Sequence, residues 1–376
     1  MRLQDNLEKE LFLLMNRLEK LRSLLQQDGY DAAVIVPGSN FLYLTGLAMN
    51  LSERVTMAVF PVFGEPFVIC PQLEAEKIRR ITGIQKTFAW TDEEGPQKAT
   101  KAAFTENNLA GKVIACEYRT TRLLEWDLIM TSLSNQVTIK PLDTILNTMR
   151  TVKEEEEIAL MCKAVICVEE ALKAAQAMMK PGVTELEVAA LLERTIRAFG
   201  GSGGGSVISG ERGCLPHAIT SNKALAEGET VILDIVAKYQ GYTADITRTF
   251  AIGELPAELK KIYRIVQDAQ QYSRENSKPG MTGEELDALA RDKISAAGYG
   301  AYFIHRSGHG LGLDTHEEPY VVKGNHIPFE IGNVFTIEPG IYLPGLGGVR
   351  IEDDAVMVTG GVHIITGFPR DLIVLK

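Results

Sequence analysis

The chain has 376 residues, of which 45% are hydrophobic and 23% are charged, as is ordinary for a globular protein. This length is too great for one hydrophobic core and therefore predicts two domains. The net charge of −10 disfavours nucleic acids and anionic membranes as the main partners. No apolar run is long enough to span a bilayer, and the charged opening residues do not resemble a signal peptide. We therefore expect a cytoplasmic protein.

The five cysteines indicate reduced thiols rather than a disulfide framework. Their number is odd, they are scattered, and none belongs to a CxxC pair, which is typical of a reducing compartment. Cys214 lies three residues before His217, but the sequence marks neither a base nor an orienting group for a nucleophilic thiol. The full set is Cys70, Cys116, Cys162, Cys167 and Cys214.

The first predicted element is a helix from Leu7 to about Gln27. Leucines recur at helical spacing over this stretch, and Asp28-Gly29 is a helix stop. The apolar stripe predicts that this helix docks on the rest of its domain. Short apolar runs then predict four strands, with helical patterns among and after them, and so an α/β domain over residues 1–150. The strands are expected at 31–37, 55–61, 66–71 and 112–117.

The pattern of apolar residues changes at Thr151, where we expect a second domain that covers residues 151–376. One long helical pattern runs from Lys153 to Met179. Its opening acids, Glu154 to Glu157, suit the positive end of a helix dipole. We interpret this acidic run as a solvated helix start rather than as a binding patch.

An internal repeat with an offset of 98 residues is the clearest signal in this second domain. Each copy opens on Lys-Pro-Gly, continues through a capping box into a helical pattern, and then supplies a histidine and an acidic hairpin. The repeat predicts two related halves with a functional site at their junction. The corresponding residues are Lys180 and Lys278, Thr184 and Thr282, Glu187 and Glu285, and, at nearly the same offset, His217 and His316.

The glycine run from Gly200 to Gly210 follows the first copy and admits two interpretations. A phosphate-binding loop is disfavoured, because the run lacks a Gly-Lys-Ser/Thr ending and a preceding strand. We expect instead a flexible connection that leads to His217 and borders the pocket.

The first acidic hairpin is predicted from a buried strand at 230–237 and an alternating strand at 243–250. Tyr239-Gln240-Gly241 forms the predicted turn between them. With the turn centre between Tyr239 and Gln240, Asp234 and Asp245 are expected to be opposed, with Cβ atoms roughly 4.5–5.5 Å apart.

A second hairpin is predicted with its centre on Gly345, which opposes Glu338 and Glu352. A lone acid here would be interpreted as a solvent-facing residue of an edge strand. Four carboxylates that face one another among apolar neighbours would instead repel, and divalent cations remove that objection. Carboxylates with one imidazole suit Mn, Co, Fe or Zn, so a two-metal hydrolase is the first hypothesis. The five candidate ligands are Asp234, Asp245, His309, Glu338 and Glu352.

Four motifs in the second domain, at 233–250, 307–319, 336–342 and 349–353, resemble the Xaa-Pro peptidases, prolidase and aminopeptidase P. That family belongs to the pita-bread superfamily, with methionine aminopeptidase and creatinase. The stretch from Gly29 to Gly46 is similar to the creatinase-type N-terminal domain. The resemblance covers nearly the whole chain. It implies a mixed α/β (α+β) fold, with a creatinase-like N-terminal α/β domain and a C-terminal pita-bread domain built on an internal pseudo-two-fold repeat.

The resemblance also implies a role for each metal ligand. Asp234 would bind the first ion, Asp245 and Glu352 would bridge the two ions, and His309 and Glu338 would bind the second. A hydroxide would bridge the ions, and Glu338 would receive the proton of the water from which it forms.

Four further residues match pocket residues of the family. His217 and His316 match histidines that hydrogen-bond the substrate and the tetrahedral intermediate, a catalytic role. His305 matches another pocket histidine, with a role in substrate binding. Arg350 shares a strand face with Glu352 and is expected to orient that carboxylate or to bind the substrate. The remaining histidines, His326 and His363, are interpreted as core or surface residues.

Two positions depart from the family pattern. Val236 stands where the family strand often has glycine, which affects packing rather than chemistry. Tyr320 stands where some dipeptidases of the family place an arginine that holds the carboxylate of a dipeptide. This second departure weakens a strict dipeptidase assignment.

The sequence therefore predicts a metallopeptidase that cleaves the bond between an N-terminal residue and proline, as a Xaa-Pro dipeptidase or aminopeptidase. Two divalent ions are the expected cofactors, Mn first, with Co, Zn or Fe as alternatives. The expected partners are a Xaa-Pro dipeptide or short peptide and a second copy in a homodimer. Two alternatives stay open: a non-peptidase hydrolase or lyase that acts on a small amide-like substrate, and a non-catalytic binding module. The complete ligand set disfavours the binding module.

Overall fold

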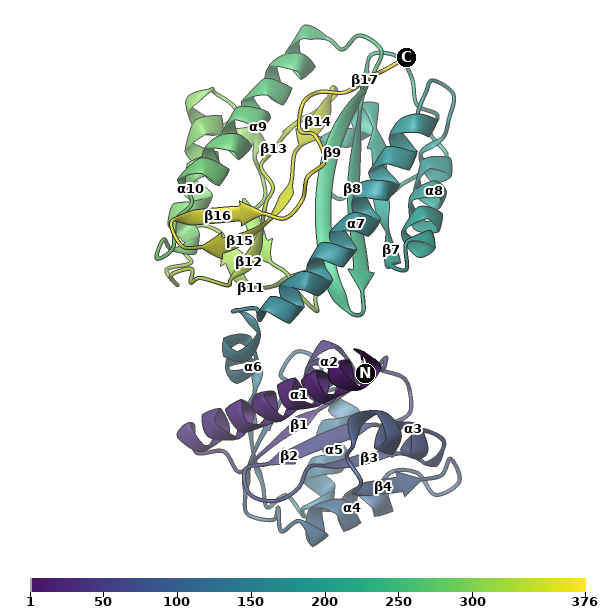
Figure 1. Ribbon diagram of the computed structural model, residues 1–376, viewed down its shortest axis with the longest axis vertical. Coiled ribbons are helices and arrows are strands. Elements are labelled where there is room, and N and C mark those ends of the chain that lie inside the picture. Colours follow the sequence, from purple (N-terminus) through teal and green to yellow (C-terminus); the bar gives the residue numbers. More distant parts are fainter. Residues whose placement is uncertain (1) are drawn as a thin grey trace. The chain divides into compact units, whose positions relative to one another are not determined.

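The computed structural model describes residues 2–376, with side chains described from residue 14 onward. The chain divides into two units, Met1–Arg150 and Thr151–Lys376, and both mix helices with strands (Figure 1). The mixed α/β class predicted from the sequence is therefore confirmed. None of the described helices combines the length and the apolar character that a bilayer span requires.

One sheet forms the centre of the first unit, with its strands in the order β4-β3-β2-β1-β5-β6. These strands are β1 (Ala32–Ile35), β2 (Met57–Pro61), β3 (Phe67–Pro71), β4 (Thr87–Trp90), β5 (Val113–Cys116) and β6 (Thr138–Pro141). The helices of this unit are α1 (Arg2–Gln27), α2 (Ser39–Thr45), α3 (Gln72–Thr82), α4 (Gln97–Glu106), α5 (Leu123–Ser132) and α6 (Asp143–Arg150).

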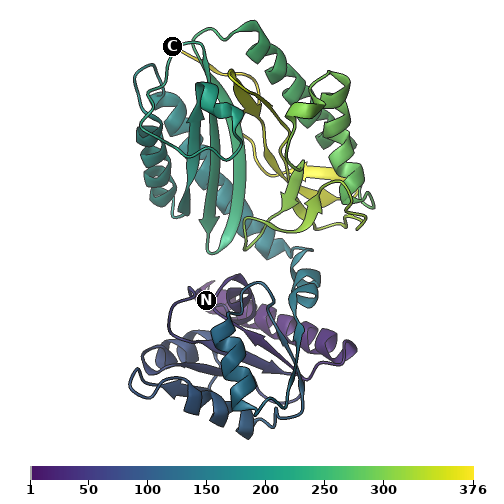
Figure 2. The same ribbon diagram turned by 180° about the vertical axis from the view of Figure 1, so that it is seen from behind.

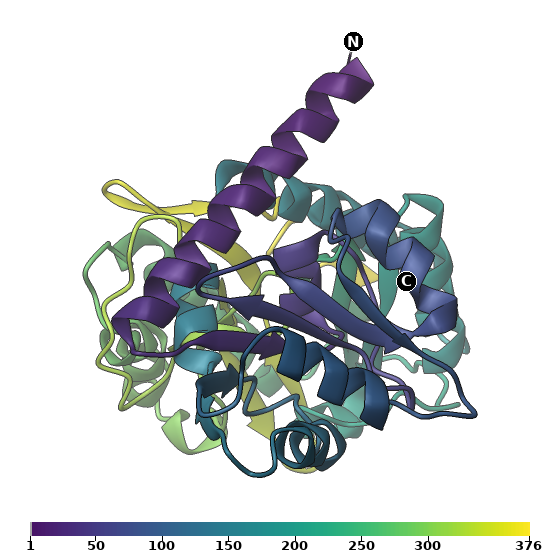
Figure 3. The same cartoon turned by 90° about the horizontal axis from the view of Figure 1, so that it is seen from below.

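Helices cover both faces of this sheet, so every side chain of β1, β2 and β3 is buried. Phe104 of α4 and Ile129 of α5 join the core on one face. α1 runs along the other face, and its N-terminal turns extend past the edge of the sheet (Figures 1 and 3). The predicted docking helix is confirmed in its second half, where Leu21 and Leu25 are fully buried. The side chains of Leu7 and Leu11 lie outside those described.

The four strands predicted for this unit are confirmed as β1, β2, β3 and β5. The sequence did not predict β4 and β6, which form the two edges of the sheet. Edge strands are partly exposed, as the burial of β4 and β6 shows, and therefore lack the continuous apolar run that marks a central strand.

The second unit is built from two groups of helices and strands. Its helices are α7 (Glu155–Met178), α8 (Glu185–Ala198), α9 (Ala257–Asn276) and α10 (Gly283–Ala296), with short 3₁₀ turns η1 (Gly210–Cys214) and η2 (Gly300–Tyr302). One sheet has the order β17-β9-β8-β7, with strands β7 (Ser202–Ser209), β8 (Glu229–Tyr239), β9 (Tyr242–Ile252) and β17 (Val374–Leu375). A second has the order β11-β10-β12-β15-β16, with β10 (Gly308–Gly310), β11 (Glu317–Val321), β12 (Val334–Ile337), β15 (Asp353–Val358) and β16 (Gly361–Ile364). A third pairs β13 (Gly340–Leu343) with β14 (Gly347–Arg350).

The strands of this unit lie between two helix pairs, α7 with α8 and α9 with α10 (Figures 1 and 2). α7 and α8 share a core with β7, β8 and β9, whereas α9 and α10 share one with β13 and β14. α8 and α10 are both 14 residues long, and each begins with the predicted capping box. The backbone N–H of Glu187 donates to Thr184 Oγ1 at 3.2 Å, and that of Glu285 donates to Thr282 Oγ1 at 3.3 Å. The helical part of the predicted repeat is thus present.

The first acidic hairpin joins β8 and β9 in a register that differs from the predicted one. Tyr239 pairs with Tyr242, so the turn has two residues, Gln240-Gly241, instead of three. Both have positive φ, 49° and 91°, which matches the twist of the flanking strands. The prediction that Asp234 and Asp245 are directly opposed is therefore wrong by two positions, but an even shift keeps them on one face. The observed pairs are Asp234 with Thr247 and Val236 with Asp245.

The second acidic hairpin has the predicted register. Gly340 pairs with Arg350 in the β13–β14 ladder, and Ile337 pairs with Asp353 in the β12–β15 ladder. Both ladders fold about Gly345, as predicted. Glu338 and Glu352 fall at the break between the two ladders, where the backbone leaves one sheet for another.

The predicted flexible connection at Gly200 to Gly210 is wrong, because most of this run forms the strand β7. β7 pairs antiparallel with β8 along its whole length. The absence of side chains lets the two backbones approach closely, since a Cβ at Gly205 would lie 2.8 Å from the carbonyl oxygen of Asp234. The glycines thus support the strand that carries Asp234.

Gly203→Ala is expected to destabilise the protein by about 1–3 kcal/mol. Gly203 has a φ of 140°, and an added Cβ would lie 2.2 Å from the carbonyl oxygen of Val236. Gly204 is the matched control, because a Cβ there would meet no atom within 4 Å. Urea unfolding of both variants measures the difference, and equal effects for the two would contradict this account.

Candidate metal centre and its pocket

A pocket of about 440 Å³ in the second unit gathers all nine residues that the sequence singled out. Pro216, Val236, Arg306 and Thr315 complete its lining. His326 and His363, interpreted as core or surface residues, are exposed and lie outside this lining. The nine residues are His217, Asp234, Asp245, His305, His309, His316, Glu338, Arg350 and Glu352.

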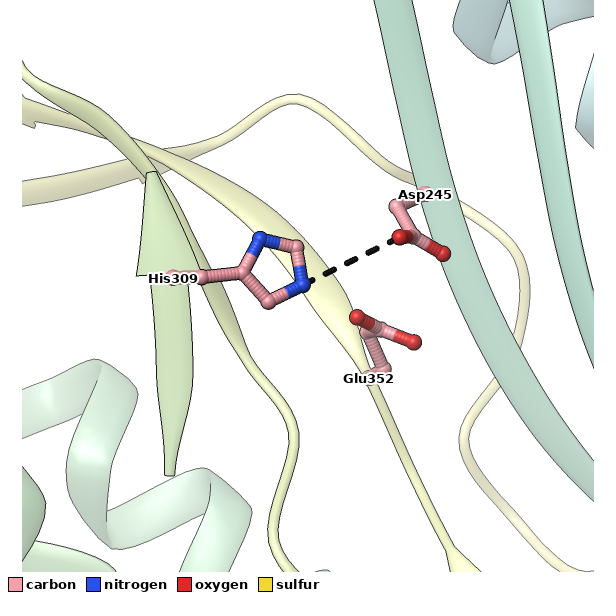
Figure 4. A group of neighbouring side chains, drawn as sticks. All are labelled: Asp245, His309 and Glu352. Carbon is pink, nitrogen blue, oxygen red and sulfur yellow. Dashed lines mark ion pairs between the residues drawn. The ribbon is translucent and has the colours of Figure 1, made fainter. Parts of the chain in front are cut away.

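Three of the candidate ligands converge in the pocket from different strands and turns (Figure 4). Asp245 comes from β9, His309 from β10, and Glu352 from the segment between β14 and β15. Each offers one ligand atom, and these atoms lie within 4.8 Å of one another. His309 Nε2 is also 3.9 Å from Asp245 Oδ2 and 3.4 Å from Glu338 Oε1. This grouping is what a divalent cation requires of carboxylate and imidazole ligands.

The hydrogen bond of His309 fixes which ring nitrogen faces the carboxylates. Nδ1 lies 3.1 Å from the carbonyl oxygen of Gly310, and because a carbonyl only accepts, Nδ1 carries the proton. Burial, and after it the neighbouring His316, lowers the pKa of His309 to about 3, so the ring is neutral. Nε2 therefore presents a lone pair to the pocket, as a metal-binding histidine does.

Burial and mutual repulsion disfavour the ionised form of three carboxylates in the pocket. Burial, followed by the charges of Glu352 and Asp234, raises the pKa of Asp245 well above its usual value. Burial likewise raises the pKa of Glu352 and raises that of Glu338 to about 7. Asp245 Oδ1 is buried without a hydrogen-bond partner among the described residues. A cation would relieve both the repulsion and the unpartnered oxygen, so these residues fit a metal site.

The stability of the metal-free protein is expected to fall as the pH rises. Folding raises the pKa of Asp245, Glu338 and Glu352, so the folded state binds more protons than the unfolded state. Their stabilising contribution is complete below the unfolded pKa, near pH 4, and is lost as the pH rises through the folded values, which for Glu338 means pH 7. We expect the Tm of chelated protein to drop by about 5 °C or more between pH 5 and pH 8.

Thermal unfolding at the two pH values, with and without Mn²⁺, measures this linkage. The rise in Tm on addition of metal should be larger at pH 8, because fewer protons then have to leave the ligands. Glu352→Gln removes one of the titrating groups and should flatten the pH dependence of the chelated protein. A metal-free Tm that increases from pH 5 to pH 8 would contradict the account.

A chain of hydrogen bonds runs from Asp234 to His305 behind the ligands. Arg350 donates from Nη2 to Asp234 Oδ2 at 2.7 Å and from Nη1 to the hydroxyl of Tyr342 at 2.9 Å. That hydroxyl lies 2.9 Å from His305 Nε2. His305 Nδ1 donates to the carbonyl of Arg306 at 2.7 Å, so Nε2 accepts and Tyr342 donates. The direction of every proton in this chain is therefore fixed.

Thr247 links the carboxylate of Glu352 to the guanidinium of Arg350 through its hydroxyl. It donates to Glu352 Oε2 at 2.6 Å and accepts from Arg350 Nε at 3.1 Å. Thr247 is also the residue that pairs with Asp234 across the hairpin. Thr247 thus connects Glu352, a ligand from the second hairpin, to the strand pair of the first hairpin that carries Asp234.

Thr247, Tyr342 and Arg306 were not among the site residues predicted from the sequence. Tyr342 could have been found from the second hairpin, because with the centre on Gly345 it shares a strand face with Arg350 on the neighbouring strand. Thr247 could be assigned to the site only from the observed register of the first hairpin, which places it opposite Asp234. Cys214, weighed as a nucleophile, is absent from the pocket lining.

Comparison with known proteins identifies the family. The model of metallopeptidase family M24 matches residues 159–359, and the model of the Creatinase/Prolidase N-terminal domain matches residues 17–152. The chain belongs to metallopeptidase family M24. It is therefore an enzyme of the metallopeptidase class, and the predicted family is confirmed.

Relatives in family M24 span nearly the whole chain. The uncharacterized peptidase YqhT of Bacillus subtilis (strain 168) is 36% identical, over 96% of this chain and 100% of its own. The crystal structure of a dipeptidase from Pyrococcus horikoshii OT3 is 37% identical, covers 96% of this chain and 100% of that chain, and has a TM-score of 0.90. The crystal structure of a prolidase from Thermococcus sibiricus is 35% identical, covers 96% of this chain and 98% of that chain, and also has a TM-score of 0.90. The predicted creatinase-like N-terminal domain and pita-bread C-terminal domain are confirmed.

Proposed function

We propose that this chain hydrolyses the peptide bond between an N-terminal residue and proline, and that two divalent metal ions serve the reaction. One observation carries the proposal: four carboxylates and the Nε2 atom of a neutral histidine meet in one pocket, with Asp245 Oδ1 left unpartnered among the described residues. Membership of family M24, and relatives described as a dipeptidase and a prolidase, support the choice of bond.

Five residues would hold the ions. Asp234 would contribute to the first ion, Asp245 and Glu352 to both, and His309 and Glu338 to the second. When bound, the ions supply a water of lowered pKa and polarise the scissile carbonyl.

The other pocket residues handle protons and position the substrate. Glu338, held by Thr336 Oγ1 at 3.3 Å, accepts the proton of the attacking water and passes it to the leaving nitrogen. His217 and His316 donate hydrogen bonds to the substrate and to the oxygen on which charge develops. His305 contacts the substrate.

Arg350 was expected either to orient a carboxylate or to bind the substrate. Its side chain is 6% exposed, and its donors serve Asp234, Thr247 and Tyr342. We therefore assign it to the orientation of a ligand, Asp234, rather than to direct contact with the substrate.

The test uses protein stripped of metal and reloaded with Mn²⁺, Co²⁺ or Zn²⁺. A Xaa-Pro dipeptide, a Xaa-Pro tripeptide and a Xaa-Ala dipeptide are offered to each form. We expect cleavage that requires both the metal and the proline. If protein with two bound ions cleaves none of them, the proposal is wrong, and small amides become the next substrates to examine.

Three further features belong to the same proposal. Manganese is the proposed native metal, since the ligand set is mostly carboxylate. A homodimer is proposed, supported by exposed apolar side chains on α5 such as Leu123 and Trp126. A cytoplasmic location is supported by the free thiols of all five cysteines. Metal analysis, sedimentation and cell fractionation test the three in turn.

A further inference from the structure

Arg306 is a pocket cation whose charge is not used by the protein. Its side chain lines the pocket. Among the residues whose side chains are described, its guanidinium makes no hydrogen bond and no ion pair. Arg350, the other arginine of the pocket, is by contrast fully engaged by Asp234, Thr247 and Tyr342. Arg306 therefore has its donors available to a ligand.

The ring of Tyr320 holds the guanidinium of Arg306 in place. Arg306 Cζ lies 4.5 Å from the centre of the ring, a cation–π contact. Tyr320 is on β11, directly opposite His309 of β10, so its side chain belongs to the face of the sheet that carries the metal ligand. The N–H groups of the guanidinium form no hydrogen bond with the described residues, so this contact leaves them available to a carboxylate. The arginine is thus oriented before any ligand arrives.

The guanidinium of Arg306 is a positive group in the pocket wall that forms no ion pair with any of the described carboxylates. The four acidic side chains of the same pocket are the proposed metal ligands, so the ions neutralise them in the loaded enzyme. The charge of Arg306 is therefore available to an anionic group of the substrate.

The anion that fits this place is a carboxylate close to the scissile bond. In a dipeptide the C-terminal carboxylate belongs to the residue directly after that bond, whereas a longer peptide has a neutral amide there. A guanidinium fork matches a carboxylate with two parallel N–H···O bonds and gains less from an amide. A pocket of about 440 Å³ has the size of a small-ligand site.

We propose that Arg306, supported by Tyr320, binds the free C-terminal carboxylate of a dipeptide substrate and so selects dipeptides over longer peptides. This inference rests on the proposed Xaa-Pro hydrolysis and specifies the length of its substrate. Tyr320, whose presence in place of an arginine weakened the dipeptidase assignment, contacts Arg306 through its ring in the fold. Arg306 thus supplies the arginine that position 320 lacks.

The first test compares kcat/KM for a Xaa-Pro dipeptide with kcat/KM for the same dipeptide as its C-terminal amide. The wild-type enzyme should favour the acid. Arg306→Gln should reduce the ratio of acid to amide by about 10- to 100-fold, mainly through KM, and Arg306→Lys should give an intermediate ratio. Arg264→Gln, which changes an exposed arginine of α9, is the control and should leave the ratio unchanged.

The second test separates support by the ring from a general effect on the fold. Tyr320→Phe keeps the ring and should keep the ratio, whereas Tyr320→Leu removes it and should lower the ratio. A ratio that is near one in the wild type, or that survives Arg306→Gln, would overturn the assignment. Equal losses for Tyr320→Phe and Tyr320→Leu would overturn the role of the ring.

Calorimetric binding of L-proline and of prolinamide to the Mn²⁺-loaded protein distinguishes this subsite from the peptidase activity. We expect proline to bind more tightly, and Arg306→Gln to remove that preference. If no Xaa-Pro peptide is cleaved but the preference for proline depends on Arg306, the proposed function is wrong and the carboxylate subsite stands. If dipeptides are cleaved but proline and prolinamide bind equally, the function stands and the subsite is wrong.

Discussion

Replacement of Asp245 by asparagine is expected to lower kcat/KM on a Xaa-Pro dipeptide by roughly a thousandfold or more, with the chain still folded. Asparagine keeps the shape of the side chain but removes its charge. In the proposed centre Asp245 is shared by both ions, so its loss weakens both, and bound ions supply several kcal/mol of transition-state stabilisation. Each 1.4 kcal/mol corresponds to about a tenfold change in rate.

The same substitution should have the opposite effect on the stability of the metal-free protein. Asp245 is 4% exposed, and burial together with nearby carboxylates raises its pKa, so ionisation at pH 8 is unfavourable. Asparagine removes that penalty, and we expect chelated Asp245→Asn to be about 1–3 kcal/mol more stable than chelated wild type at pH 8. The stabilisation by added Mn²⁺ should shrink at the same time.

Three measurements check this pair of effects: metal content after dialysis, kcat/KM, and thermal unfolding with and without Mn²⁺. Asp268→Asn, at an exposed position on α9, is the matched control and should change none of them. An Asp245→Asn protein that keeps two ions and full activity would remove Asp245 from the centre. Loss of activity with loss of folding would instead mean that the aspartate is structural.

The two acidic hairpins show how far local pattern reaches. For Glu338 and Glu352 the alternation of the strands and the glycine-rich turn gave the correct register about Gly345. For Asp234 and Asp245 the same reasoning was two positions out, because the turn centre was placed between Tyr239 and Gln240, whereas it lies one residue later, between Gln240 and Gly241. The face of a strand follows from its period of two, so both aspartates were still assigned to the pocket side.

Contacts between distant segments are what the sequence could not supply. Thr247 and Arg350 are 103 residues apart, and the local sequence around either residue does not predict their hydrogen bond. The glycine run was misjudged for a related reason. Its conformation depends on the close approach of β8 and not on its own flexibility. Packing between segments decided both cases.

Arg248 makes several such contacts between distant segments, and one of them is with the backbone of the proposed ligand Glu352. Arg248 follows Thr247 on β9 and is 2% exposed. Its guanidinium pairs with Asp353 at 2.6 Å, next to Glu352 in the chain. It also donates to four carbonyl oxygens, those of Thr247, Glu352, Phe368 and Pro369. One buried cation therefore joins β9, the Glu352 segment and the C-terminal segment.

Arg248→Lys is expected to destabilise the protein by about 3–5 kcal/mol, or roughly 10 °C in Tm. An ammonium group cannot reach four carbonyls and a carboxylate at once, so several buried acceptors, and in part Asp353, would lose their partner. Because the Glu352 carbonyl is one of those acceptors, the affinity for Mn²⁺ should also fall by about 10- to 100-fold.

Arg370→Lys is the matched control for this substitution. Arg370 approaches the same carboxylate, at 3.4 Å from Asp353 Oδ2, but its side chain is 28% exposed. It should therefore cost less than about 1 kcal/mol. Urea unfolding and metal titration of both variants, with Asp353→Asn to complete a double-mutant cycle, measure the coupling. If Arg248→Lys costs no more than Arg370→Lys, the buried arginine does not organise the segments that carry the centre. If stability falls but the affinity for Mn²⁺ is kept, its influence ends at the fold and does not extend to Glu352.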